Sequence, residues 1–176
     1  MKRIVSACTA VASVVFTGVM LAQAPAAMTA TGPGVEAQGS YSRLKPNVIK
    51  AAEKMPAADY QYKPTPDIRT FARVVNHITE AQFHSCGAIN HTPWDASKMP
   101  SDTASKEEIV AALKASFDEC DKAYASVLDG ELLQVGQAKR SKLGIAWGNV
   151  SHDNEQYATL SLYLRLKGLV PPTSEK

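Results

Sequence analysis

Two segments of helical periodicity hold the side chains best suited to chemistry in this 176-residue chain. His152 and Gln156 are four residues apart, so they face the same side of a helix. Their stripe is otherwise apolar, and both side chains need partners because an unpaired buried polar group is costly. Such a pair, joined by a histidine from a facing helix, is a common geometry for binding zinc, nickel or iron.

Two interpretations of this pair stay open. The residues form a divalent-metal site, or they make hydrogen bonds that only hold the helices together. Gln is a rare and weak metal ligand, so the spacing alone favours the second interpretation. His77 and His84 are seven residues apart on another predicted helix, about 10 Å along its axis, which is too far for both to bind one ion. His91 follows Gly87 and is predicted to lie in a loop.

Two cysteines, Cys86 and Cys120, lie in the same region as the histidines, whereas Cys8 lies near the N-terminus. Two cysteines cannot form a cysteine-rich zinc site, and the chain has no C-x-x-C-H motif for covalent haem. In an oxidising compartment we expect Cys86 and Cys120 to form a disulfide, and the alternative is a pair of buried free thiols. Their core-facing positions argue against a catalytic nucleophile.

Residues 1–26 have the layout of a secretory signal peptide. A basic start precedes an uncharged apolar run over residues 4–21, and two small-residue A-x-A exits follow. We predict cleavage after Ala26, and therefore a periplasmic or secreted protein without an integral membrane segment. One alternative is a retained anchor, because the run has about the minimum length for a membrane span. The other is a lipoprotein modified at Cys8, although almost no apolar stretch precedes that residue.

Beyond a flexible tether predicted over residues 27–39, the periodicity is helical throughout, with no strand-like alternation. Residues 40–176 are therefore predicted to form an all-α four-helix bundle. Ser105 and Glu108 form a capping box that starts one helix, and Gly168 ends the last helix. The expected helices cover roughly residues 41–55, 67 or 70 to 88, 105–127 and 141–168.

The connection predicted over residues 89–104 bears on the order of the helices. Its roughly 16 residues span on the order of 50 Å when extended, whereas a helix of about 20 residues is roughly 30 Å long. The connection can therefore cross the whole bundle, and we expect the second and third helices to run parallel. Parallel helices place Cys86 and Cys120 at similar heights, whereas antiparallel helices separate them.

The charge of the chain argues against two kinds of partner. The chain has 19 Lys and Arg against 17 Asp and Glu, and loss of Lys2 and Arg3 with the signal peptide leaves a net charge of zero. A neutral protein without basic runs has no electrostatic footprint for nucleic acid or for anionic lipid. The P-loop, G-x-G-x-x-G and G-x-S-x-G motifs are also missing from the sequence.

Four segments form a recognisable pattern. They are Arg69-Thr70-Phe71, Val75-Asn76-His77-Ile78, residues 152–157, and residues 163–172 with an R-x-K-G-x-x-P-P exit. In these segments the chain resembles the DinB-like superfamily, and the likeness covers roughly residues 40–174. The stretch from Ser116 to Tyr124 is also similar to the third helix of exported members. The resemblance implies a bundle in up-down-down-up order, which agrees with the parallel helices expected above.

The resemblance also implies a metal site. Family members typically bind a divalent ion through three histidines, one on the second helix and an H-x-x-x-H pair on the last helix. His77 matches the first position and His152 the second, but Gln156 stands at the third. We therefore expect zinc, nickel or iron to bind weakly or not at all.

Two functions remain for this chain. The first is a metal-dependent hydrolase or transferase of unknown substrate, with a metal-activated water as nucleophile. The second is a non-catalytic bundle that binds a small molecule or a partner, for which a second copy of the chain is one candidate. Characterised relatives include thiol-dependent transferases and isomerases. Their thiol cofactors are cytoplasmic, so we do not expect an exported member to use them in the same way.

Overall fold

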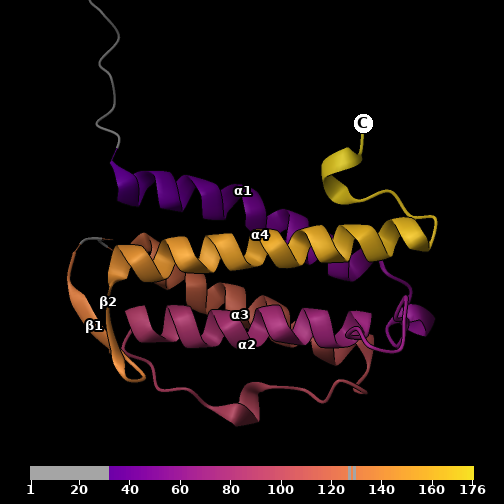
Figure 1. Ribbon diagram of the computed structural model, residues 1–176, viewed down its shortest axis with the longest axis horizontal. Coiled ribbons are helices and arrows are strands. Elements are labelled where there is room, and N and C mark those ends of the chain that lie inside the picture. The colour runs from indigo at the N-terminus through magenta and orange to yellow at the C-terminus, as the bar shows by residue number, and fades with distance from the viewer. Residues whose placement is uncertain (1–31, 127, 129) are drawn as a thin grey trace, which may run out of the picture. The chain divides into compact units, whose positions relative to one another are not determined.

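The computed structural model describes residues 32–126, 128 and 130–176, which form four helices and a short β-hairpin (Figure 1). The elements are α1 (Pro33–Lys54), α2 (Phe71–Ile89), α3 (Lys106–Ala125), β1 (Leu132–Val135), β2 (Ala138–Ser141) and α4 (Lys142–Leu166). The predicted signal peptide and the first part of the predicted tether lie outside the described residues. Among the described helices, none is long and apolar enough to cross a membrane.

Helix α1 begins earlier than the periodicity predicted. It starts at Pro33 rather than near residue 41, so the prediction of a flexible tether is wrong for residues 33–39. Proline suits the first position of a helix because its ring presets a helical backbone angle. Gln38 then anchors the added turns by donating from Nε2 to the carbonyl of Tyr124 at 2.6 Å. Tertiary contacts of this kind extend the helix, and the local composition does not reveal them.

The other three helices begin where their caps predict. Thr70 caps α2, Ser141 caps α4, and Ser105 with Glu108 forms the reciprocal capping box at the start of α3. Each cap satisfies a backbone N–H of the first turn that has no partner within the helix. At the other end of α4, Gly168 has a φ of 75°, a conformation that favours glycine.

The hairpin corrects the expectation of an all-α protein. β1 and β2 pair antiparallel, with Val135 opposite Ala138, and Gly136 turns the chain with a φ of 58°. Each strand has only four residues, too few to show an alternating pattern. Leu133 is nevertheless buried against the helices, and the hairpin leads directly into α4 through Ser141. The loop that precedes α4 is therefore ordered by its own pairing and by one buried leucine.

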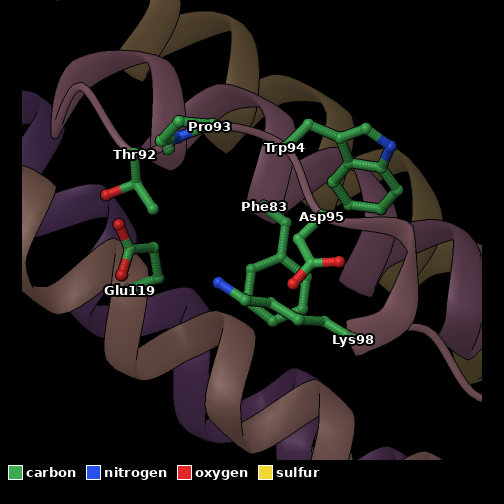
Figure 2. A pocket seen from close by; sticks show the side chains of 8 residues that line it. Phe83, Thr92, Pro93, Trp94, Asp95, Lys98 and Glu119 are labelled. Atoms are coloured by element: carbon green, nitrogen blue, oxygen red, sulfur yellow. The ribbon is translucent and has the colours of Figure 1, made fainter.

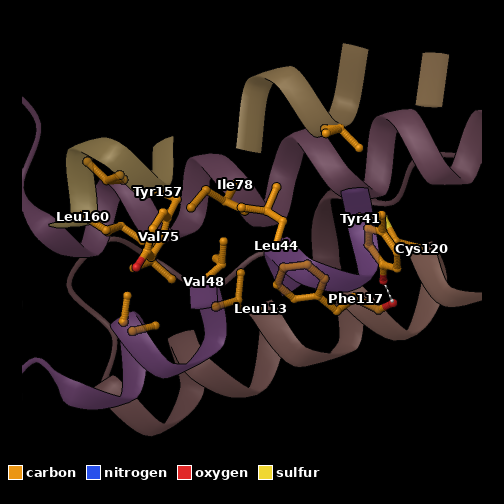
Figure 3. Packing of buried hydrophobic residues seen from close by; sticks show 14 of the residues in the cluster. Tyr41, Leu44, Val48, Val75, Ile78, Leu113, Phe117, Cys120, Tyr157 and Leu160 are labelled. Atoms are coloured by element: carbon orange, nitrogen blue, oxygen red, sulfur yellow. Dashed lines mark hydrogen bonds between the residues drawn. The ribbon is translucent and has the colours of Figure 1, made fainter. Parts of the chain in front are cut away.

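The apolar core lies between the four helices (Figure 3). Phe71 and Ile78 from α2, Leu113 from α3 and Leu160 from α4 are all completely buried. These positions recur every three or four residues along their helices, so one stripe of each helix faces inward. The core is continuous from the hairpin end to the end at which α2 begins.

Two contacts between α2 and α3 lie one turn apart along both helices. From α3, Ser116 Oγ donates to Gln82 Oε1 of α2 at 2.9 Å, and Cys86 lies beside Cys120 one turn further along both helices. The connection after α2 includes a short 3-10 helix, Ala96–Lys98, and runs along the length of α2 (Figure 1). The long connection thus lies against α2 (Figure 1).

Candidate metal centre

Two histidines from different helices meet at one edge of the core. His77 of α2 and His152 of α4 face each other edge to face, and their Nε2 atoms are 3.1 Å apart. Two imidazole nitrogens that each lie about 2.0–2.1 Å from one tetrahedral ion are roughly 3.3 Å apart. The spacing of the pair is therefore close to that of two ligands of a single metal ion.

A buried carboxylate orients one of these rings. Asp153 is 1% exposed, and its Oδ1 lies 3.2 Å from Nδ1 of His152. A carboxylate on the far nitrogen fixes the tautomer and the direction of a ligand histidine, so that Nε2 is left free to bind. In this way Asp153 turns the Nε2 atom of His152 towards His77.

The same carboxylate belongs to a polar network that crosses the core. Oδ2 of Asp153 accepts from Gln82 Nε2 at 3.1 Å and from Asn149 Nδ2 at 3.4 Å, and Gln82 in turn accepts from Ser116. Burial raises the pKa of Asp153, and the hydrogen bond from His152 opposes that rise. The network supplies the partners that a buried carboxylate requires, and it links α2, α3 and α4.

His77 is held in the form that can bind a metal. Burial lowers the pKa of its ring, and the nearby charges of Arg69, His152 and Arg73 lower it further. The neutral ring keeps a lone pair on one nitrogen, which is the requirement for a metal ligand. Its Nδ1 atom is buried and has no hydrogen-bond partner within the described part of the chain, so Nε2 is the atom that the fold presents to His152.

Gln156, at the predicted third position, makes no hydrogen bond with the pair. Its side chain is 7% exposed, lies one turn beyond His152 on α4, and has no hydrogen-bond partner among the described residues. The same residues contain no group of three or more His, Cys, Asp or Glu side chains that could hold a metal. Two imidazoles without a third strong ligand do not fit a tightly held resident ion.

The remaining histidines lie elsewhere. His84 stacks on Trp94 with ring centroids 4.2 Å apart, and His91 lies in the connection after α2 with a φ of 56°. The hollow beside Trp94 encloses only about 10 Å³, and Phe83 and Lys98 help to line it (Figure 2). It is too small for any ligand larger than water, so neither His84 nor His91 contributes to a site there.

The two cysteines pair as predicted. Cys86 and Cys120 are at disulfide distance, with Cα atoms 4.9 Å apart, and both are completely buried. This separation lies within the range that a disulfide requires. Since neither sulfur is exposed, the pair links α2 to α3 and provides no nucleophile.

The polar network behind the histidines was missed by the sequence analysis. Asp153 is adjacent to His152, and Gln82 lies between Ile78 and Cys86 on the apolar stripe of α2. A polar residue on such a stripe is a visible signal, because it must find a partner inside the protein. The identity of that partner depends on which helices face each other.

The fold and the site together define a helical bundle with an inward-facing histidine pair on its second and fourth helices. A family model of the DinB superfamily matches residues 41–160, and the chain belongs to this superfamily. The crystal structure of a DinB-like protein from Bacillus cereus is similar with a TM-score of 0.64 at 13% identity, over 77% of this chain and 93% of that chain.

A second solved structure gives the same result. A protein from Exiguobacterium sibiricum assigned to the DinB family has a TM-score of 0.58 at 14% identity, over 78% of this chain and 93% of that chain. At this level of identity the likeness shows the fold alone. No curated protein matches the chain.

Proposed function

We propose that this protein is an exported DinB-superfamily bundle whose His77–His152 pair binds a divalent cation weakly. The 3.1 Å separation of the two Nε2 atoms is the observation on which the proposal rests. Asp153 supports it, because a histidine held from behind by a carboxylate is typical of metal ligands. Gln156 stands where the family has a third imidazole, and its neutral carbonyl oxygen is a poorer ligand for zinc or nickel.

The proposal includes the up-down-down-up order of the helices. It is supported by contacts that advance in step along α2 and α3, from Gln82–Ser116 to Cys86–Cys120. Between α2 and α4 the contacts run in opposite directions along the chain, since Tyr163 reaches Arg69 and Asp153 reaches Gln82. In this order His77 and His152 come from neighbouring helices and can share one ion.

Metal titration of a single substitution tests the site. Gln156→His restores the missing imidazole, and we expect calorimetry with zinc and nickel to show affinity raised by at least about tenfold, or about 1.4 kcal/mol. His152→Ala in the same background should abolish the gain. Gln137→His, on the exposed turn of the hairpin, is the matched control and should change nothing. Equal affinity of the native and Gln156→His proteins would show that position 156 does not complete a site with the two histidines.

The catalytic form of the proposal is a metal-dependent hydrolase or transferase, in which the bound cation would activate a water molecule. The second candidate is a non-catalytic bundle that binds a small molecule, and it is favoured by the unpartnered amide of Gln156. Native protein purified from metal-containing medium separates the two. Stoichiometric retained metal supports the catalytic form, and metal-free protein that still binds a ligand supports the second.

Export is part of the same proposal. It is supported by the layout of residues 1–26 and by the pairing of Cys86 with Cys120, because disulfides persist in oxidising compartments. The intact mass of the native protein should lack the first 26 residues and should correspond to oxidised cysteines. Retention of Lys2 and Arg3, or two free thiols in the native protein, would contradict export by this route.

A further inference from the structure

A pocket of about 360 Å³ opens beside the histidine pair. Val74 and Gln156 lie at its inner surface, one turn from His77 on α2 and from His152 on α4 respectively. A helical turn advances about 5.4 Å, so the pocket lies next to the pair without including it. Its volume falls in the range of pockets that hold small molecules.

One polar side chain at the inner surface of the pocket makes no hydrogen bond within the described residues. Gln156 is 7% exposed, and it lines the pocket. The fully buried side-chain atoms that lack a partner lie on other residues, so the amide of Gln156 is open to the pocket and can meet a ligand there. Because an amide both donates and accepts, it can bind either a carboxylate or an ammonium group.

The rim of the pocket has charges of both signs. Arg69, Asp67 and Glu155 all line the pocket, and all three are exposed. None of these three side chains makes an ion pair within the part of the chain that the structure describes. The position of Arg69 is fixed from inside, since Tyr163 donates its hydroxyl hydrogen bond to the Arg69 carbonyl at 2.6 Å.

The walls of the pocket are apolar. Ile68 and Leu162 are 42% and 54% exposed, which is high for large apolar side chains, and both line the pocket with Val74. An apolar ligand body placed between them would remove this surface from water, at a gain of roughly 25 cal/mol for each Å². The pocket therefore offers apolar walls, one cation, two anions and one free amide.

We infer that this pocket binds a small zwitterion with an apolar side chain, the chemistry of an apolar amino acid or a short apolar peptide. Arg69 pairs with the carboxylate, Glu155 and Asp67 pair with the ammonium group, and the amide of Gln156, next to Glu155 in the chain, adds a hydrogen bond to one of these two ligand groups. A simple carboxylate would face two uncompensated acidic side chains, and a simple amine would face Arg69. The inference requires no metal on the histidine pair, so it is independent of the metal site proposed above.

Four probes separate the chemical features of this ligand. Leucine and leucyl-leucine carry both charges, isocaproate lacks the ammonium group, and isoamylamine lacks the carboxylate. Binding is measured by titration with NMR detection of the Gln156 side-chain amide, in the presence of EDTA. We expect leucine or leucyl-leucine to bind more tightly than either single-charge probe and to shift the Gln156 signal. The tighter of the two zwitterions identifies an amino acid or a peptide as the source.

Variants assign the two charges. Arg69→Gln should lower the affinity for the zwitterion by about tenfold, equivalent to about 1.4 kcal/mol. Arg69→Lys should recover part of that lost affinity. Glu155→Gln should lower the affinity for the zwitterion but should not lower the affinity for isocaproate, which has no ammonium group. Arg43→Gln and Glu36→Gln, which change the same charges on α1, are the matched controls and should bind as the native protein does.

Three results would overturn the inference. They are tighter binding of isocaproate or isoamylamine than of both zwitterions, binding that leaves the Gln156 signal unmoved, and no binding of any probe. Thermal unfolding of each variant checks that the fold is intact, which we expect because the Arg69 and Glu155 side chains are exposed and make no hydrogen bond or ion pair among the described residues. Because EDTA removes metal from the assay, failure here leaves the metal titration of Gln156→His unaffected.

Discussion

The interface between α1 and α3 and the interface between α2 and α4 are built from different side chains. In the first, Tyr41 stacks on Tyr124 at 4.0 Å and packs against Phe117, while the ion pair of Lys45 with Asp121 lies at the surface. In the second, the histidine pair and the buried Asp153 replace apolar contacts. The first interface is held by the burial of aromatic rings, whereas the second places hydrogen-bonded polar side chains between the helices.

The difference teaches which residues stabilise the fold and which exist for chemistry. Apolar packing stabilises in proportion to the area removed from water. Buried polar groups stabilise little in net terms, because each hydrogen bond replaces one made with water, and each lost partner is costly. The network around Asp153 therefore adds little net stability, and it lies directly behind the His77–His152 pair, where Asp153 contacts His152.

The largest expected effect is at the apolar interface. Phe117 is 1% exposed, so Phe117→Ala leaves a cavity between α1 and α3 and should lower the free energy of unfolding by about 3–5 kcal/mol. Denaturant titration measures the loss. Leu162→Ala, at an exposed position, is the control and should cost far less. Equal losses in the two variants would remove the distinction between packing and site residues.

A smaller effect is expected in the polar network. Asp153→Asn keeps the shape but replaces one carboxylate oxygen by an amide donor, which then opposes either His152 or the donors of Gln82 and Asn149, and should cost about 1–3 kcal/mol. The same substitution should weaken zinc binding to the Gln156→His protein, because a neutral amide replaces the carboxylate that orients His152. Asp118→Asn, exposed on α3, is the control for both measurements. A stable variant with unchanged metal affinity would show that Asp153 does not position His152.

The smallest effect is a dependence of stability on pH. The folded protein lowers the pKa of His77 below its usual value of 6.5, chiefly through burial. Just below pH 6.5, the His77 side chain binds a proton in the unfolded chain but not in the folded chain. The contribution of neutral His77 to the free energy of unfolding is therefore present above pH 6.5 and is lost as the pH falls towards the folded pKa.

His77→Phe removes this proton and should flatten the pH dependence of the unfolding midpoint between about pH 7 and pH 5, relative to the native protein. His84→Phe, on the same helix but stacked on Trp94, is the matched control. If the pH dependence of the unfolding midpoint is unchanged in His77→Phe but flattened in His84→Phe, then the proton uptake belongs to His84 and the prediction for His77 is wrong.

Local signals were sufficient for much of the fold. The capping box of Ser105 with Glu108, the cap at Thr70 and the glycine stop at Gly168 define helix ends through atoms a few residues apart. Such signals are readable because both partners lie within one turn of each other. Cys86 and Cys120 were likewise expected to pair, and the structure places them at disulfide distance.

The sequence by itself therefore determined the helices, the cysteine pair and the histidines that face inward, since periodicity and spacing act between near neighbours. Only the tertiary structure decided that α1 begins at Pro33, that a hairpin precedes α4, and that Asp153 stands behind His152. The same holds for the pocket that Gln156 lines beside the histidines. Each of these features depends on side chains that are distant in sequence, and their contacts exist only once the helices have packed.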